Sequence, residues 1–272
     1  MSFILHSPEA LMSAMPTLFI SHGAPTVAID NSEARAFLEG LGRTLGRPEA
    51  IVVVSAHWEV EGGVLVTGAA WPDTIHDFGP FDRRLYQMRY PAPGAPDLAA
   101  DIADSITNAG LCGRLDERRG YDHGAWIPLT LMYPQADVPV VEVSIDPTLG
   151  PDHHLRLGRA LAPLRRRNVL VIGSGSLTHD LHEFRHHGAD DPAPDWVARF
   201  GDWMATAIEQ GRQDDLLQYR MVAPEAERNH PTDEHLLPLF SAMGAAGPVL
   251  KGQRIHHSHR YGVITMDAYA FH

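Results

Sequence analysis

IVVVSAHWE, residues 51–59, is a run of β-branched apolar residues that ends at a histidine. Four consecutive apolar residues without polar alternation are typical of a strand that is buried on both faces of a sheet. Two further stretches have the same form, PTLFISHG at 16–23 and VLVIGSGSLTH at 169–179. Each stretch predicts a central strand followed by a histidine.

Short apolar runs alternate with helix-like segments along the chain. The predicted strands are Thr17–Ile20, Ile51–Val54, Val64–Thr67, Val138–Ile145, Val169–Ile172 and Gly262–Met266. The predicted helices are Glu33–Leu45, Asp97–Ala109, His153–Leu164, Trp196–Gln210 and Asp233–Met243. This alternation indicates an α/β fold in which helices flank a largely parallel sheet. Because no linker-like stretch divides the chain, we expect a single domain over residues 1–272.

Composition and charge narrow the range of partners and compartments. The net charge of −12 opposes the approach of nucleic acid and of anionic lipid surfaces. The N-terminus has no basic region typical of a signal peptide, and no stretch of about 20 apolar residues occurs, so we expect a soluble cytoplasmic protein. A single cysteine beside 17 histidines leaves imidazole as the available metal ligand. No particular oligomeric state is predicted.

Three histidines follow predicted strands, namely His22, His57 and His179. Ligands of open α/β sheets bind in the crevice beyond the carboxyl ends of the strands, and parallel strands would bring these imidazoles to the same edge. A lone histidine after a strand is more often a hydrogen-bonded loop residue, and the Gly-Ser-Gly-Ser run at 173–176 also suits a tight turn. The position shared by all three favours one joint site.

A fourth candidate is His235, in the segment HPTDEHLLPLF at 230–240. Thr232 suits a helix N-cap, which predicts His235 in the first helical turn, beside the apolar face. His230 precedes Pro231 and is therefore expected to be extended. On local sequence alone, a position on the helix surface for His235 and in a turn for His230 is the simpler explanation.

The segment GYDHGAWIPL at 120–129 contains a fifth candidate, His123. Flanking glycines allow the backbone to approach a ligand closely. Asp122 is placed to orient a neighbouring imidazole through its ring N–H. Aromatic residues that suit either a pocket wall or the core are Trp58, Phe78, Tyr90 and Trp126.

In these segments the chain resembles the class III extradiol ring-cleavage dioxygenase superfamily, in particular its DOPA-dioxygenase-like branch. The resemblance extends from Pro16 to Phe271. It is carried by PTLFISHGAPT, IVVVSAHWE, TIHDFGPFDRRLYQMRYPAPG, GYDHGAWIPL, VPVVEVSID, VLVIGSGSLTHDL, HPTDEHLLPLF and YGVITMDAYAF. It implies a catalytic domain that opens the ring of a small catechol with dioxygen at a non-haem metal.

The resemblance implies that His22, His57 and His235 bind one divalent metal ion. Other branches of the superfamily commonly use a glutamate as the third ligand, so Glu234 is the alternative to His235. Fe(II) suits dioxygen chemistry, whereas Zn(II) fits three histidines but cannot exchange electrons with dioxygen. Two alternatives follow: a zinc-dependent hydrolase of an amide or ester with His179 as base, and a non-catalytic protein that binds a metal or ligand.

The resemblance also implies roles for the residues around the metal. His179 is expected to be the acid/base beside the substrate, and His123 is counted with it as catalytic. His230, Trp126 and Phe78 are expected to contact the substrate.

The expected partners are a small aromatic diol and dioxygen. The acidic net charge disfavours polyanionic substrates, so a catechol with at most one carboxylate is predicted. Residues 79–82 read Gly-Pro-Phe-Asp where the resembling proteins have Gly-Gly-Phe-Pro. This difference bears on the identity of the substrate more than on the chemistry.

Overall fold

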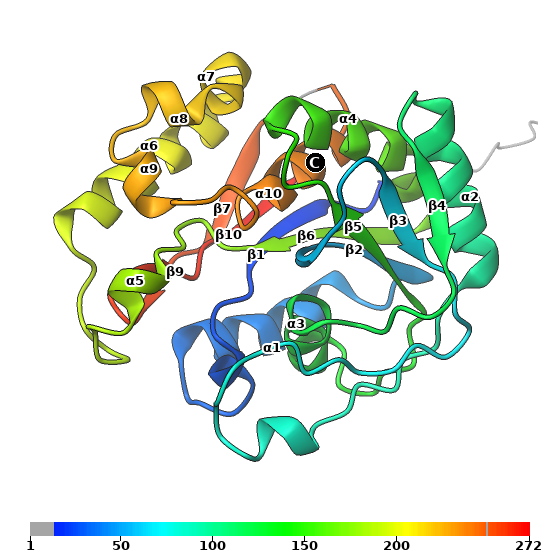
Figure 1. Cartoon of the computed structure of the whole chain (residues 1–272), viewed down its shortest axis with the longest axis horizontal. Helices are drawn as coiled ribbons and strands as arrows, with labels where there is room; N and C mark the ends of the chain where they lie inside the picture. The colour runs from blue at the N-terminus through cyan, green and yellow to red at the C-terminus, as the bar shows by residue number, and fades with distance from the viewer. Residues whose placement is uncertain (1–13, 249) are drawn as a thin grey trace, which may run out of the picture.

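The computed structural model describes residues 14–248 and 250–272, and a mixed sheet of eight strands runs through it (Figure 1). In sheet order the strands are β4 (Gly113–Asp116), β3 (Val64–Thr67), β5 (Val140–Ile145), β2 (Ala50–Glu59), β6 (Val169–Gly175), β1 (Thr17–Ser21), β10 (Ala268–Phe271) and β7 (Gly252–His256). A separate two-stranded sheet joins β8 (His259–Arg260) to β9 (Ile264–Thr265). The predicted absence of a signal peptide concerns residues 1–13, which lie outside the described residues.

The four central strands β5, β2, β6 and β1 run parallel to one another. Antiparallel pairs occur only towards the margins of this sheet, where β3 pairs with β5, and β10 pairs with β1 and β7. The predicted α/β fold with a largely parallel sheet is confirmed. The carboxyl ends of the central strands consequently meet at one edge.

Helices cover both faces of the sheet. They are α1 (Glu33–Leu45), α2 (Pro96–Asn108), α3 (His123–Met132), α4 (Pro151–Leu161), α5 (Leu181–Phe184), α6 (Asp195–Gln210), α7 (Gln213–Leu217), α8 (Tyr219–Val222), α9 (Ala226–Asn229) and α10 (Leu237–Ala245). Short 3-10 helices span Pro25–Ala28, Leu85–Gln87 and Ala162–Arg167. Figure 1 shows α1 and α3 on one side of the sheet, with α4 and α10 on the other. None of the helices in the described part of the chain is long and apolar enough to span a membrane.

The apolar run in β2 supplies two cores at once. Ile51 and Val53 pack in the core formed with α1 and α3, whereas Val52 and Val54 pack in the core formed with α2, α4 and α10. Side chains of a strand alternate between faces, so a strand covered on both sides must be apolar at every position. This accounts for the absence of polar alternation in the sequence.

Several predicted elements differ from the structure at their boundaries, and for two of them the physical reason is clear. The helix expected over Asp233–Met243 begins at Leu237, with Pro238 in its first turn, and Thr232 caps nothing. Proline lacks an N–H and is therefore favoured at a helix start. Of the strand expected over Gly262–Met266, only β9 forms, because Tyr261 and Gly262 have positive φ angles in the turn that joins β8 to β9.

Helix α3 was not predicted, nor were β4, β7, β8 and β10. Nearly all of α3 is buried, and it contains Pro128. A helix that is apolar on every side shows no 3.6-residue periodicity, so its sequence lacks the usual helical signal.

Helices α4 and α10 cross with their backbones in contact. A Cβ atom added at Gly158 would lie 2.1 Å from the carbonyl oxygen of Ser241, and one at Gly244 would lie 2.1 Å from that of Leu155. Only hydrogen fits at either position. This crossing fixes the direction of α10 and of the segment that precedes it.

We expect Gly244→Ala to lower the free energy of unfolding by about 1–3 kcal/mol, because the methyl group forces the helices apart. Gly201→Ala in α6 is the matched control, since nothing lies within 4 Å of the added Cβ atom. It should be stabilising by about 0.5–1 kcal/mol through helix propensity. Urea unfolding followed by circular dichroism measures both, and equal stability of the two variants would contradict the close crossing.

Candidate metal centre

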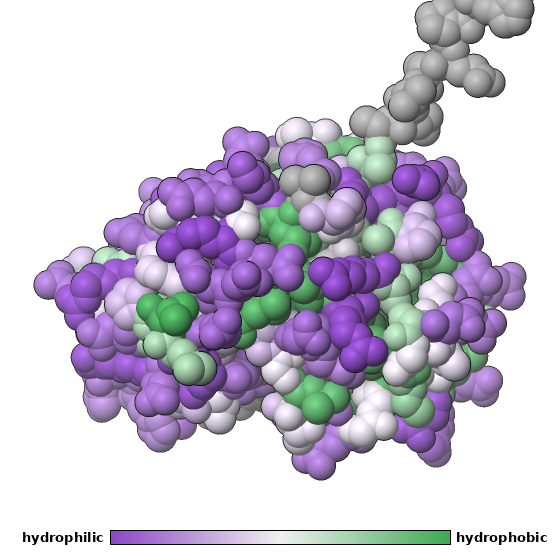
Figure 2. Space-filling view, turned by 90° about the horizontal axis from the view of Figure 1, so that it is seen from above, coloured by the Kyte–Doolittle hydropathy of each residue, from purple (hydrophilic) through white to green (hydrophobic). Residues whose placement is uncertain are grey.

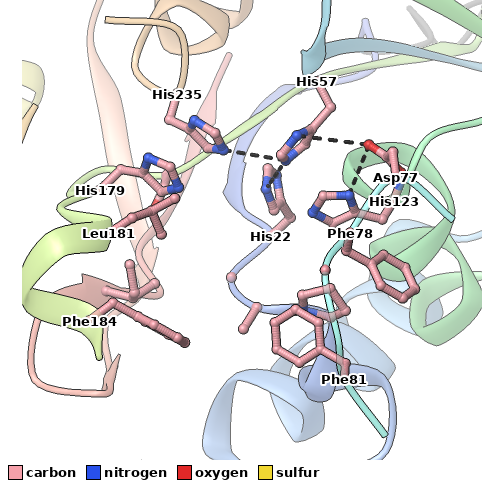
Figure 3. A pocket seen from close by; sticks show the side chains of 16 residues that line it. His22, His57, Asp77, Phe78, Phe81, His123, His179, Leu181, Phe184 and His235 are labelled. Carbon is pink, nitrogen blue, oxygen red and sulfur yellow. Dashed lines mark hydrogen bonds and ion pairs between the residues drawn. The ribbon is translucent and has the colours of Figure 1, made fainter. Parts of the chain in front are cut away.

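A cavity of about 250 Å³ lies at the edge where the central strands end (Figure 3). Histidines form one part of its lining: His22, His57, His123, His179 and His235. The rest of the wall is mainly apolar and includes Ala24, Pro25, Phe78, Phe81, Leu181, Phe184 and Ile264. The cavity therefore has an imidazole end and an aromatic end.

The sheet positions His22 and His57. His22 directly follows β1, and its backbone N–H donates to the carbonyl oxygen of Gly175 at 2.9 Å. His57 lies within β2 rather than beyond it, two residues past Ser55, where the regular pairing with β6 ends. Both side chains thus leave the parallel core, on either side of β6.

A glycine in β6 positions His235, which lies in the turn before α10 rather than in a first helical turn. The carbonyl oxygen of His235 accepts a hydrogen bond from the backbone of Ser176 at 2.8 Å. A Cβ atom at Gly175 would lie 2.1 Å from this same oxygen. The glycines of the Gly-Ser-Gly-Ser run therefore belong largely to the strand and allow the His235 segment to approach it.

The Nε2 atoms of three histidines converge. His57 Nε2 lies 3.0 Å from His22 Nε2 and 3.3 Å from His235 Nε2. Two ligands at 2.0–2.1 Å from one metal, at octahedral or tetrahedral angles, are about 2.8–3.4 Å apart. The spacing of these nitrogens fits that of ligands to a shared ion.

The Nδ1 atoms of two of these rings face hydrogen-bond acceptors. His22 Nδ1 lies 3.0 Å from Ser174 Oγ, whose own proton goes to the carbonyl oxygen of Gly124 at 2.5 Å. The hydroxyl must then accept from His22 Nδ1–H. His235 Nδ1 lies 2.9 Å from Glu234 Oε1, and a carboxylate can only accept. In the neutral rings, both Nε2 atoms therefore carry a lone pair.

Burial keeps these rings neutral. Loss of solvation, followed by the charges of neighbouring histidines, lowers the pKa of His22 and of His235 well below 6.5. The same two causes lower the pKa of His57 to about 4, against the opposing effect of Asp122 and Asp77. Each neutral ring keeps one proton, and in His22 and His235 it lies on Nδ1, so the Nε2 lone pairs of these two rings are free to bind a cation. The chemistry of this donor set fits a divalent metal.

Among the described residues, the side chains able to bind a metal form two groups. One comprises His22, His57 and His123, and the other comprises His179, Glu234 and His235. The predicted set of three takes two members from the first group and one from the second. The two groups are adjacent, because the rings of His57 and His235 are only 4.8 Å apart.

His123 is the first residue of α3 and follows the N-cap Asp122. Its ring centroid lies 3.8 Å from that of His57. Its Nδ1 atom lies 3.0 Å from Asp77 Oδ2, and its backbone N–H donates to Asp77 Oδ1 at 2.9 Å. Asp77 was not predicted; it stands next to Phe78 in one of the segments that carry the family resemblance, which was the only signal for it.

His179 faces the cavity from the opposite side, stacked on His235 with 3.4 Å between ring centroids and 13° between planes. Its Nδ1 atom lies 3.7 Å from Glu234 Oε1. Burial, and then the neighbouring His230, lower the pKa of His179 to about 3. The ring is therefore neutral at ordinary pH and able to take up a proton.

Two residues expected to contact the substrate lie behind the cavity instead. His230 is fully buried, with Nε2 2.8 Å from the carbonyl oxygen of Leu177. Trp126 is also buried, donates through Nε1 to the carbonyl oxygen of Ile75, and packs behind Phe78. Phe78 does line the cavity, together with two aromatic residues that the sequence did not single out, Phe81 and Phe184.

Comparisons with known proteins agree over nearly the whole chain. The family described as the catalytic LigB subunit of aromatic ring-opening dioxygenase matches residues 16–272. A 4,5-DOPA dioxygenase extradiol of Beta vulgaris is 44% identical over 259 residues, which is 94% of this chain and 96% of that protein. Another from Escherichia coli (strain K12) is 42% identical over 244 residues, 87% of this chain and 88% of that protein.

The fold has a solved counterpart as well. The crystal structure of an uncharacterized protein from Escherichia coli K12 superposes with a TM-score of 0.77 at 34% identity. The match covers 95% of this chain and 100% of the chain in that crystal structure.

Proposed function

The chain belongs to the family of the catalytic LigB subunit of aromatic ring-opening dioxygenases, and from this premise we propose that His22, His57 and His235 bind the metal at which it works. The enzyme is a metal-dependent, non-haem extradiol dioxygenase that opens the ring of a DOPA-like catechol with dioxygen. The observation that carries the assignment of ligands is the convergence of three Nε2 atoms in a buried pocket. Those of His22 and His235 are unprotonated, because the Nδ1–H of each ring donates to an acceptor.

The metal proposed is Fe(II). When bound, it supplies positions for the two catechol oxygens and for dioxygen, and the redox capacity that zinc lacks. The chain's own contribution is to hold three neutral imidazoles on one side of the ion. Ser174 and Glu234 fix two of these rings by accepting their Nδ1–H protons.

The aromatic end of the cavity binds the substrate ring. Phe78, Phe81 and Phe184 stand across from the histidines (Figure 3). Among the described residues that line the cavity there is no lysine or arginine. Leu181, at 54% exposure, marks the open side. The ring substituent of the catechol points there, so that its charged groups remain in water and lose little solvation.

His179 and His123 handle protons on either side of the metal. Burial and then His230 lower the pKa of His179, so the ring is unprotonated at neutral pH. We assign to it the acceptance of a proton from a catechol hydroxyl, because it faces the cavity beside the proposed metal ligand His235. It returns a proton as the ring opens. The apolar walls limit the access of water, which would compete for these protons.

Single changes of His22, His57 or His235 to alanine should abolish stoichiometric metal binding. Metal analysis after loading with Fe(II) or Zn(II) and dialysis measures this, with His182→Ala on exposed α5 as the control. Glu234→Gln should retain one metal with about 10- to 100-fold weaker affinity, since Glu234 orients His235. Complete loss of metal in Glu234→Gln, with retention in His235→Ala, would instead make Glu234 the third ligand.

We expect His179→Ala to lower the turnover number about 100- to 10,000-fold while metal content stays at one per chain. The ring stacks on His235 but is not one of the three proposed ligands. The measurement pairs oxygen uptake with metal analysis on the same sample. Parallel loss of metal and activity would place His179 among the ligands and refute its role as acid/base.

The protein loaded anaerobically with Fe(II) should consume dioxygen with ortho-diols and not with mono-phenols. Only a diol offers two adjacent donors and two ionisable protons. Oxygen uptake and the visible spectrum of the ring-opened product are followed over a panel that includes DOPA. Zinc-loaded protein is the control and should be inactive; hydrolysis of an ester or amide panel by that form would favour a hydrolase, and binding without turnover would favour a non-catalytic role.

A further inference from the structure

Asp77 is the only carboxylate among the described residues that line the cavity, and it stands between two imidazoles (Figure 3). Its Oδ2 atom lies 3.0 Å from His123 Nδ1 and 3.9 Å from His57 Nδ1. Its Oδ1 atom accepts the backbone N–H of His123 at 2.9 Å. One carboxylate group therefore contacts both the backbone and the ring of His123.

The backbone around Asp77 is tied to the segment that leads into α3. Ile75 N–H donates to the carbonyl oxygen of Tyr121 at 2.8 Å, and Tyr121 N–H donates to that of Asp73 at 2.7 Å. Trp126 Nε1–H donates to the carbonyl oxygen of Ile75 at 2.8 Å. These bonds hold the Asp77 loop and the start of α3 in a fixed relation, so the contact between Asp77 and His123 is built into the fold.

Asp77 can only accept hydrogen bonds. An ionised carboxylate beside Nδ1 favours the tautomer in which Nδ1 carries the proton. The ring edge opposite Asp77, which includes Nε2, is turned towards the cavity (Figure 3).

We propose that Asp77 is a positioning residue that holds His123 in its Nδ1–H tautomer, so that the unprotonated Nε2 atom faces the substrate. The role rests on the proposed function, in which His123 takes part in proton transfer. Asp77 acts on His123 rather than on His57, because its Oδ2 atom lies 3.0 Å from His123 Nδ1 but 3.9 Å from His57 Nδ1. Proton uptake by His123 then needs no rotation of the ring.

Asp77→Asn tests the proposal because it keeps the shape of the side chain and replaces an acceptor facing His123 Nδ1 by a donor. The amide oxygen can still accept the backbone N–H of His123, while the amide nitrogen replaces Oδ2 and donates to Nδ1. The ring must then carry its proton on Nε2. Asp82→Asn is the matched control, since Asp82 lies on the same loop, is exposed and contacts Arg84.

The first readout is independent of catalysis. Protein labelled with ¹⁵N at histidine and loaded with zinc alone is compared by NMR, with His123→Ala identifying the signals of His123. We expect protonated Nδ1 in the wild-type protein and in Asp82→Asn, and protonated Nε2 in Asp77→Asn. An unchanged tautomer in Asp77→Asn, or protonated Nε2 in the wild-type protein, would overturn the proposal.

The second readout is the turnover number of the Fe(II)-loaded enzyme on a catechol. A wrong tautomer in an Asp–His pair costs about 10,000-fold in the serine-protease case, and a general acid/base contributes about 100- to 10,000-fold. We expect a loss in this range for Asp77→Asn, with metal content and thermal unfolding as in Asp82→Asn. Loss of metal in step with activity would mean that Asp77 acts through His57, and loss of stability alone would mean that it only caps α3; either outcome refutes the proposal.

The two readouts separate this proposal from the proposed function. Inactive wild-type enzyme on every catechol would refute the proposed function, while NMR of the zinc form still decides the tautomer. A switched tautomer with full turnover on a catechol would refute the positioning role and leave the proposed function standing.

Discussion

Three imidazole nitrogens held about 3 Å apart in a buried pocket are the constraint around which the rest of the molecule is arranged. Burial lowers the pKa values of these rings, so they remain uncharged at neutral pH and the Nε2 lone pairs of His22 and His235 stay free for a cation. The fold holds the rings in place, because Ser174 and Glu234 accept the Nδ1–H protons of His22 and His235. A bound cation offsets the repulsion between the Nε2 lone pairs.

Close backbone contacts also hold the histidines together, at positions where only glycine fits. Gly175 allows the carbonyl oxygen of His235 to lie against β6, and Gly244 allows α10 to lie against α4. The first contact sets where His235 emerges, and the second sets the direction of the helix that follows. The geometry of the cavity therefore depends on packing well outside it. Figure 2 shows one face of the molecule, on which hydrophilic residues predominate and smaller hydrophobic patches lie among them.

The sequence was sufficient for the fold class and for part of the site. Apolar runs without alternation identify strands covered on both faces, and a histidine at the end of such a run must lie at the common edge of parallel strands. That argument brings His22, His57 and His179 together without any structure. It fails for Asp77, which lies in a loop without regular structure and reaches the site through hydrogen bonds to the segment before α3.

His235 shows why the rest of the site could not be predicted from the sequence. Its neighbours Thr232, Asp233 and Glu234 all suit the start of a helix, yet α10 starts at Leu237. The carbonyl oxygen of His235 is taken by Ser176 of the loop that follows β6, a contact that joins residues 59 positions apart. Local propensity predicted a helical turn, and a tertiary hydrogen bond beside a glycine prevailed over it. Glu234, freed from a helical cap, instead faces both His235 and His179, as Asp77 faces both His57 and His123. Each side of the centre thus pairs one carboxylate with one converging imidazole and one imidazole open to the cavity.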